Sequence, residues 1–127
     1  MAKRILVVDD EEDIRKVVHF VLEKQGYAVE LAADGQEALD LIDRRPPDLI
    51  ILDLKMPRFS GYRLFAQLKS DSRLKTIPII VVTALTQDSD VEDTEWARRM
   101  GADAFLTKPF DLDELSQRVA EMAARFV

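Results

Sequence analysis

Hydrophobic and polar positions alternate along the chain in five repeats of one unit: a short apolar run, then a segment with helical periodicity. The apolar runs predict five strands, at Arg4–Asp9, Ala28–Ala32, Asp48–Asp53, Ile77–Thr83 and Ala104–Thr107. The first, third and fourth runs are continuous in Val, Ile and Leu, as in parallel strands buried on both faces. Right-handed crossovers between such strands predict an α/β fold, with one parallel sheet covered by helices on both faces.

The segments between the runs predict five helices. The first helix is expected to place one apolar face toward the sheet, formed by Ile14, Val17, Val18, Val21 and Leu22, and to end at Gly26. Turn and cap signals predict the other boundaries. The second helix is expected to begin near Asp34 and Gly35 and to end at Pro46 and Pro47. The third helix is expected to follow Ser60 and Gly61, the fourth to end at Gly101, and the fifth to begin near Asp111.

Size and charge narrow the classes of function. A chain of 127 residues that is 47% hydrophobic suits one compact domain. Its 18 Lys and Arg against 24 Asp and Glu give a net charge of −6, which disfavours direct binding to nucleic acid. No apolar stretch approaches the ~20 residues of a membrane span. With no cysteine in the chain, these features predict a cytoplasmic protein without a membrane segment.

Candidate functional residues lie at the ends of the predicted strands, where open parallel sheets form their binding crevice. They are Asp9 and Asp10 after the first strand, Asp53 at the end of the third, Thr83 at the end of the fourth, and Lys108 after the fifth. Three carboxylates about 5 Å apart would repel by about 3 kcal/mol per pair at an effective dielectric of ~20, so a cation is expected among them. A few carboxylate ligands with room for water favour Mg²⁺ over zinc or calcium.

A carboxylate can also attack phosphorus and form an aspartyl phosphate when a metal and a lysine neutralise the transferring group. Asp53 is the preferred nucleophile, because it is the lone acid that ends a continuous apolar strand. Asp9 and Asp10 would then hold the metal. Lys108 would pair with one phosphoryl oxygen, and the Thr83 hydroxyl would donate a hydrogen bond to another.

Four motifs resemble one known family in order and spacing: VVDDE, LIILDLKMPRFSG, VTA and LTKPF. The chain resembles, over nearly its whole length, the receiver domains of two-component response regulators. This resemblance implies a CheY-like, flavodoxin-like fold with strand order 2-1-3-4-5. It also implies that residues 1–127 form one receiver domain and that no output domain is present.

The resemblance implies a specific metal site. Asp53 is the phospho-acceptor in this interpretation, and it binds Mg²⁺ together with Asp10. Asp9 would act through a water molecule, and the backbone carbonyl of Lys55 would complete the ligands from the protein. Mn²⁺ could substitute for Mg²⁺.

The resemblance also implies a switch. Thr83 and Phe105 would form the hydroxyl and aromatic pair that responds to phosphorylation, while Lys55 and Ala84 would contact the phosphoryl group through their backbones. The Lys108–Pro109 peptide bond is expected to be cis. Phosphorylation would change the surface of the fourth helix, fifth strand and fifth helix.

The implied partners are a histidine kinase or histidine phosphotransfer protein upstream, and an effector protein or a missing output domain downstream. Homodimerisation on phosphorylation stays open. Phe20 lies off the apolar face of its helix, so it is interpreted either as a docking contact for the kinase or as a partly buried residue. The protein is expected to catalyse only its own phosphorylation and slow dephosphorylation.

Other conspicuous residues have structural interpretations. Glu11, Glu12 and Asp13 are expected only to start the first helix, where the helix dipole favours acids. His19 is expected to be exposed to solvent. Trp96 is expected to pack in or beside the core, with a contact to a partner protein as the alternative.

Three alternative functions remain open. A Mg²⁺-dependent hydrolase with an aspartyl phosphate would carry a second acid at the position of Lys55. A flavin or nucleotide module would need a Gly-, Ser- or Thr-rich loop where this chain has acids. A phosphorylation-independent interaction module would be expected to lack part of the acidic cluster.

The stretch between Thr83 and Lys108 is a few residues longer than usual in the family, so the fourth helix or the loop before it is expected to be enlarged.

Overall fold

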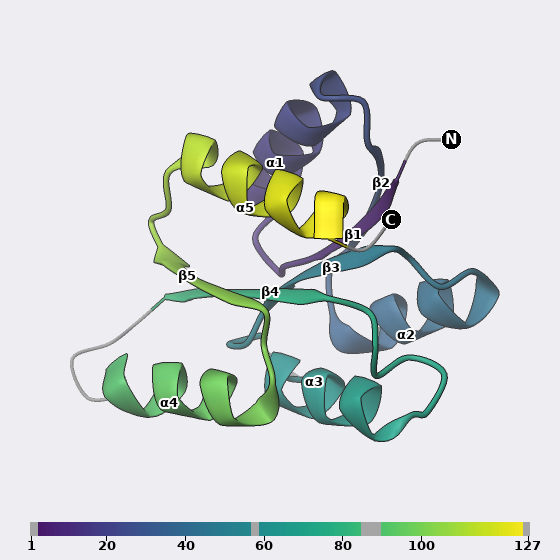
Figure 1. Ribbon diagram of the computed structural model, residues 1–127, viewed down its shortest axis with the longest axis vertical. Coiled ribbons are helices and arrows are strands. Elements are labelled where there is room, and N and C mark those ends of the chain that lie inside the picture. The colour runs from purple at the N-terminus through teal and green to yellow at the C-terminus, as the bar shows by residue number, and fades with distance from the viewer. Residues whose placement is uncertain (1–2, 57–58, 85–89, 126–127) are drawn as a thin grey trace.

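Strands and helices alternate along the whole chain in the computed structural model (Figure 1). The structure describes residues 3–56, 59–84 and 90–125. Within these ranges the strands are β1 (Arg4–Val8), β2 (Ala28–Ala32), β3 (Leu49–Asp53), β4 (Ile79–Ala84) and β5 (Ala104–Lys108). The helices are α1 (Glu12–Lys24), α2 (Gly35–Arg44), α3 (Gly61–Ser70), α4 (Asp90–Met100) and α5 (Leu112–Arg125). All ten predicted elements are present, with boundaries shifted by at most a few residues.

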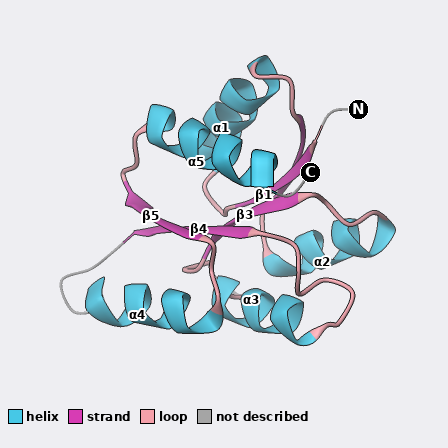
Figure 2. Cartoon of the chain, in the orientation of Figure 1, coloured by secondary structure: helices cyan, strands magenta, loops and turns pink. Residues whose placement is uncertain are grey.

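The strands form one parallel sheet in the order β2-β1-β3-β4-β5. Strand β2 therefore forms one edge of the sheet and lies beside β1. Strands β3, β4 and β5 follow in order on the other side of β1. Figure 2 shows α1, α2, α3 and α4 each lying between one strand and the next, with α5 after the last strand. This confirms the predicted doubly wound, flavodoxin-like fold and places all strand carboxyl ends at one edge of the sheet.

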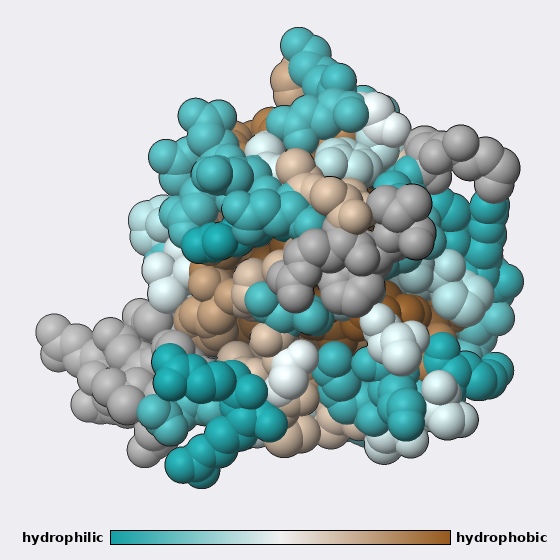
Figure 3. All heavy atoms as spheres, viewed as in Figure 1, coloured by the Kyte–Doolittle hydropathy of each residue, from teal (hydrophilic) through white to brown (hydrophobic). Residues whose placement is uncertain are grey.

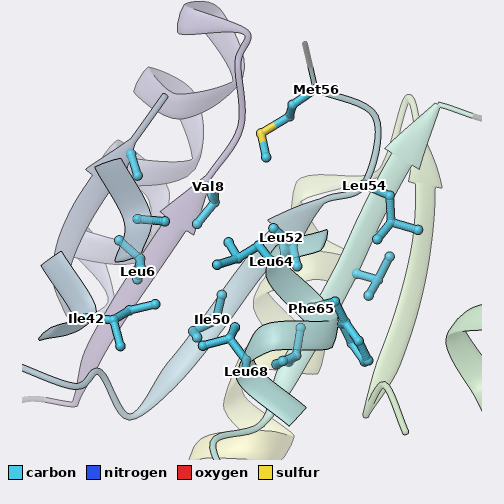
Figure 4. Packing of buried hydrophobic residues seen from close by; sticks show 14 of the residues in the cluster. Leu6, Val8, Ile42, Ile50, Leu52, Leu54, Met56, Leu64, Phe65 and Leu68 are labelled. Carbon is cyan, nitrogen blue, oxygen red and sulfur yellow. The ribbon is translucent and has the colours of Figure 1, made fainter. Parts of the chain in front are cut away.

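Helices cover both faces of the sheet, with α1 and α5 on one side and α2, α3 and α4 on the other (Figure 1). Each side has its own hydrophobic core. The side of α2, α3 and α4 contains a cluster in which leucines and isoleucines of β1 and β3 meet α2 and α3 (Figure 4), including Leu6, Val8, Ile42, Ile50, Leu52, Leu64, Phe65 and Leu68. Hydrophilic residues cover the outer faces of α4 and α5, and hydrophobic residues show between them (Figure 3).

The helix boundaries follow the predicted cap signals. Asp34 caps α2, because its side chain accepts the N–H of Glu37 at 2.8 Å. Ser60 caps α3 in the same way, through the N–H of Arg63. Gly26 follows α1 with a φ of 96°, a backbone conformation that side-chain-bearing residues rarely adopt.

Gly61 fixes the start of α3 against the end of β3. A Cβ atom at this position would lie 2.0 Å from the carbonyl oxygen of Asp53. The N–H of Gly61 also donates to the carbonyl of Leu54 at 2.9 Å. Because no larger residue fits here, glycine allows the loop after Asp53 to turn back tightly beside the carboxyl end of β3.

Two details refine the predicted packing. Val17 is 37% exposed, so it lies at the edge of the apolar face of α1, while Val18 and Leu22 are buried. The packing role predicted for Trp96 is confirmed, because its ring centroid lies 4.9 Å from that of Tyr62 and 5.1 Å from that of Phe65, on α3.

The predicted enlargement between Thr83 and Lys108 is only partly described. Helix α4 has 11 residues, whereas residues 85–89 before it lie outside the described ranges. Among the described helices, none combines the length and the apolar character that crossing a membrane requires.

Candidate functional site

The predicted site residues meet at the carboxyl edge of the sheet. Asp53 is the last residue of β3, and Lys108 is the last residue of β5. Asp9 directly follows β1, and its N–H still donates to the carbonyl of Ala32 on β2. Thr83 lies near the end of β4, between these strands. The parallel register therefore brings together side chains that are far apart in the sequence.

Three aspartates form a compact acidic cluster. Asp9, Asp10 and Asp53 each offer a carboxylate oxygen, and these oxygens lie within 4.8 Å of one another. Asp9 and Asp53 are each only 3% exposed, whereas Asp10 is exposed. Hard oxygen donors open to solvent on one side suit a Mg²⁺ ion that keeps part of its water shell. The residues present therefore fit the metal that the sequence predicted.

The ammonium group of Lys108 lies among these carboxylates. Its Nζ is 2.8 Å from Oδ2 of Asp9 and 3.2 Å from Oδ2 of Asp53, and its side chain is 10% exposed. A cation between two buried carboxylates offsets the repulsion that they would otherwise feel. Lys108 thus supplies positive charge beside the proposed phospho-acceptor.

Burial and neighbouring charges shift the pKa values of Asp53, Asp9 and Lys108. Burial raises the pKa of Asp53 to about 6, with the charge of Lys108 opposing the shift and that of Asp9 adding to it. Burial also raises the pKa of Asp9, against the hydrogen bond from Lys108. For Lys108 burial acts downward, but the hydrogen bond to Asp9 and the charge of Asp53 outweigh it, so the pKa stays above its ordinary value. The lysine is therefore charged at neutral pH.

The loop after β3 contacts the acceptor carboxylate through its backbone. The N–H of Lys55 donates to Oδ1 of Asp53 at 3.1 Å. Lys55 was predicted to contribute backbone groups to the phosphoryl and metal sites, and its amide does lie beside Asp53. The part assigned to its carbonyl oxygen stays a prediction.

Thr83 carries a hydroxyl that is ready to donate a hydrogen bond. The residue is fully buried, and its Oγ1 has no hydrogen-bond partner among the described residues. A buried unpaired hydroxyl costs about 1–3 kcal/mol, which a new acceptor could recover. Ala84 is exposed and pairs with Lys108 across β4 and β5. Ala84 follows Thr83 directly on β4, so their side chains point to opposite faces of the sheet.

Phe105 lies on the same face of the sheet as Thr83. Phe105 pairs with Val81, and side chains two positions apart on a strand share a face. The ring is partly buried and packs against the core on the side of α2, α3 and α4. This placement is compatible with the predicted switch pair, which stays a prediction. The Lys108–Pro109 peptide bond is cis, as predicted.

Two residues near the site were missed by the sequence interpretation. Glu11 is the N-cap residue of α1, as its expected place at the helix start requires, although its side chain makes no capping hydrogen bond. Its Oε2 also lies 3.1 Å from Nζ of Lys108, a contact that the sequence did not predict. Arg15, one turn further along α1, donates from Nη1 to the carbonyl oxygen of Asp9 at 2.7 Å. The available signal was the short sequence distance from the end of β1 to Glu11 and Arg15, because it keeps both residues near the carboxyl end of that strand. Glu12 lies in the first turn as expected, paired with Lys16 at 3.0 Å.

The outer face of α1 carries the remaining residues of interest. His19 was predicted to be exposed but is half-buried: its side chain is 37% exposed, and its Nε2 lies 2.6 Å from Oε2 of Glu23. Phe20 is 60% exposed, and Nζ of Lys24 lies 4.8 Å from its ring centroid. The alternative interpretation of Phe20 as a partly buried residue is therefore wrong, and its ring is accessible to a partner.

The fold and the acidic edge together define a flavodoxin-like protein with a cluster suited to a cation. The sequence model of the family described as response regulator receiver domain matches residues 5–120, and the chain belongs to this family. It is the receiver domain of a two-component response regulator.

Curated relatives support this assignment over nearly the whole chain. The chain is 44% identical to the response regulator MprA of Mycobacterium sp. (strain KMS), over 98% of this chain and 52% of that protein. It is 42% identical to the probable transcriptional regulator ycf27 of Porphyridium aerugineum, over 97% of this chain and 49% of that protein. The chain spans about half the length of these relatives.

Solved structures show the same architecture. A putative response regulator from Chloroflexus aurantiacus is 34% identical, with a TM-score of 0.88 that covers 98% of this chain and 99% of that one. The chemotaxis protein CheY4 of Vibrio cholerae is 31% identical, with a TM-score of 0.81 over the full length of both chains.

Proposed function

We propose that Asp53 accepts a phosphoryl group from a phosphohistidine of a histidine kinase or histidine phosphotransfer protein. In this reaction a carboxylate oxygen of Asp53 forms a bond to phosphorus. The bond between phosphorus and the histidine nitrogen breaks, and that nitrogen keeps the electron pair and takes up a proton. The observation that carries the proposal is the buried Asp53 carboxylate with the Lys108 ammonium 3.2 Å away.

Side chains and backbone groups around Asp53 fit this transfer. With a pKa of about 6, Asp53 is mostly ionised at neutral pH and can act as a nucleophile. Lys108 would neutralise one phosphoryl oxygen as negative charge arrives, and the unpaired hydroxyl of Thr83 would donate to another. The amide of Lys55, in the loop after β3, and that of Ala84, at the end of β4, would contact the group.

The acidic cluster would hold the cofactor. Asp10 and Asp53 are proposed as direct ligands of Mg²⁺, Asp9 as a ligand through water, and Lys55 as a ligand through its carbonyl, with Mn²⁺ as a substitute. When bound, the cation neutralises phosphoryl oxygens during the transfer. The protein's own part is to keep Asp9 and Asp53 buried and fixed, through the N–H groups of Glu11 and Lys55.

The output is proposed to pass through Thr83 and Phe105. Movement of the Thr83 hydroxyl toward the phosphoryl group would leave space for the Phe105 ring on the same face of the sheet, and would change the surface of α4, β5 and α5. This surface would control an effector protein or an output domain, and phosphorylation could also drive homodimerisation. Couplings of this type are about 1–3 kcal/mol.

The relatives suggest the kind of output. The ycf27 relatives are named probable transcriptional regulators, and RpaA of Synechocystis is named a DNA-binding transcriptional regulator. Because the net charge of this chain is −6, DNA contacts are assigned to another domain or partner and not to this domain. The chain would act in the cytoplasm and would catalyse only its own phosphorylation and slow dephosphorylation.

The mass of the intact protein tests the proposal. The parent and Asp53→Asn are incubated with a small acyl-phosphate donor, with and without Mg²⁺. Gain of one phosphoryl group by the parent alone, and only with Mg²⁺, is expected. Equal phosphorylation of Asp53→Asn would overturn the assignment of the acceptor.

A further inference from the structure

In the part of the chain that the structure describes, Lys108 has one carboxylate partner outside the three-aspartate cluster. Among the ion pairs of the described residues, its Nζ contacts Asp9 at 2.8 Å, Asp53 at 3.2 Å and Glu11 at 3.1 Å. Asp9 and Asp53 belong to the cluster whose oxygens lie within 4.8 Å of one another, and Glu11 does not. Lys108 therefore contacts two proposed metal ligands, Asp9 and Asp53, and one carboxylate that is not a proposed metal ligand, that of Glu11.

Lys108 and a divalent cation would compete for the same oxygens. On Asp9, Oδ1 accepts the N–H of Glu11 at 2.9 Å, and Oδ2 faces Lys108. On Asp53, Oδ1 accepts the N–H of Lys55 at 3.1 Å, and Oδ2 again faces Lys108. A cation bound by these aspartates would repel the ammonium group, so the lysine must give up part of both contacts.

Glu11 is placed to keep the displaced ammonium group close. Its backbone is fixed at both sides, because its N–H donates to Asp9 and its carbonyl accepts the N–H of Arg15 at 3.1 Å. Its side chain, by contrast, is 57% exposed and makes no capping hydrogen bond, so it can follow a moving partner. Without this carboxylate, Lys108, which is 10% exposed, would be left as a nearly buried cation beside a divalent one.

We propose that Glu11 is a positioning residue for Lys108: it holds the ammonium group at the mouth of the site when a divalent cation occupies the aspartates, and thereby strengthens cation binding. This inference rests on the proposed function and adds to it a residue that touches neither the metal nor the phosphoryl group. The lysine stays within reach of an incoming phosphoryl oxygen without blocking the metal site.

A nuclear Overhauser measurement on the Mg²⁺-loaded protein tests the position directly. The expected result is a contact between the side-chain methylenes of Lys108 and Glu11 that persists, or grows, when MgCl₂ is added. Loss of this contact on addition of MgCl₂ would overturn the inference, because Glu11 would then not hold the displaced lysine.

The effect on affinity is tested by calorimetric titration with MgCl₂. Glu11→Gln is expected to weaken Mg²⁺ binding by about two- to five-fold, the equivalent of one partly exposed ion pair. The matched control is Glu12→Gln, which removes one charge from the next residue of the chain, where the carboxylate pairs with Lys16 and not with Lys108. This control should change the affinity by less than about 1.5-fold, since screened surface charges act weakly.

A double-mutant cycle with Lys108→Met separates a direct contact from general charge. In the Lys108→Met background, Glu11→Gln should weaken binding no more than Glu12→Gln does. Equal weakening by Glu11→Gln in both backgrounds would overturn the inference while leaving the proposed function intact. Absence of Mg²⁺ binding by the parent would instead overturn both.

Discussion

Lys108, at the end of β5, places its ammonium nitrogen 3.2 Å from Oδ2 of Asp53, at the end of β3, with β4 between the two strands. The pair is 55 residues apart in sequence and almost fully buried. A lone buried carboxylate would tend to bind a proton, and a lone buried ammonium group would tend to lose one. Each therefore helps to keep the other charged in the absence of metal.

Replacing the lysine should separate chemistry from metal binding. Lys108→Met is expected to slow phosphorylation of Asp53 by a small acyl-phosphate donor by about tenfold or more, because positioned charge is a large part of phosphoryl-transfer catalysis. Mg²⁺ should still bind, since Lys108 competes with the cation for Asp9 and Asp53. Stopped reactions analysed by intact mass measure the rate, and Lys75→Met, at an exposed lysine, serves as the control. An unchanged rate in Lys108→Met would exclude a catalytic part for the lysine.

The raised pKa of Asp53 predicts a pH-dependent stability of the metal-free protein. In the folded state Asp53 has a pKa of about 6 and so holds its proton up to about that pH, whereas the ordinary pKa of an aspartate side chain is 3.8. The stability from this proton is therefore present below about pH 4 and is lost as the pH rises through 6. Asp53→Asn should match the parent near pH 4 and exceed its free energy of unfolding by about 1–3 kcal/mol at pH 7, at ~1.4 kcal/mol per pKa unit.

Denaturant unfolding at several pH values, in the presence of a chelator, measures this difference. Glu121→Gln, at an exposed acid, is the control and should show little pH-dependent difference from the parent. A constant difference between Asp53→Asn and the parent from pH 4 to pH 7 would show that the pKa of Asp53 is not raised.

The exposed ring of Phe20 predicts an effect on phosphotransfer that depends on the donor. Phe20→Ala should slow transfer from a cognate kinase or phosphotransfer protein by about tenfold, within the range for an aromatic anchor at a protein interface. Phosphorylation by a small donor should be unchanged, because the 60% exposed ring lies on α1 and outside the acidic cluster. Val17→Ala, at an exposed position on the same helix, is the control. Equal rates with both donors in all variants would remove Phe20 from the docking surface.

The buried hydroxyl of Thr83 predicts a coupled response to phosphorylation. Addition of Mg²⁺ and beryllofluoride, which mimics the phosphoryl group, should move the NMR resonances of Thr83 and Phe105 together. In Thr83→Val, which keeps the shape but lacks the hydroxyl, the Phe105 shift should shrink while the mimic still binds. Full movement of Phe105 in this variant would mean that the ring responds by a route other than the threonine.

Local sequence patterns were sufficient to predict the fold. Continuous apolar runs such as 49–52 specify buried parallel strands, and Asp34, Ser60 and Gly26 act within their own turns, so their effects do not depend on distant contacts. Val17 shows the limit of the pattern. It has the spacing of a core residue but is 37% exposed, because the extent of a buried helix face depends on how the helix rests on the sheet.

The site was predictable as far as strand ends determine it. Asp9, Asp53, Thr83 and Lys108 were identified because the carboxyl ends of parallel strands converge in any such fold. Glu11 was not identified, because a helix start explains an acid at that position and the reach of a flexible side chain to Lys108 appears only in three dimensions. Arg15 was missed for the same reason, since its partner is the backbone carbonyl of Asp9.

A crystal structure with Mg²⁺ and beryllofluoride tests the central claim most directly, namely that Asp53 accepts a phosphoryl group beside a divalent cation. Beryllofluoride is expected on a carboxylate oxygen of Asp53, with Mg²⁺ bound by Asp10 and Asp53 and with Nζ of Lys108 in contact with a fluorine atom. An acidic cluster without either group, under conditions that saturate a known receiver domain, would contradict the account.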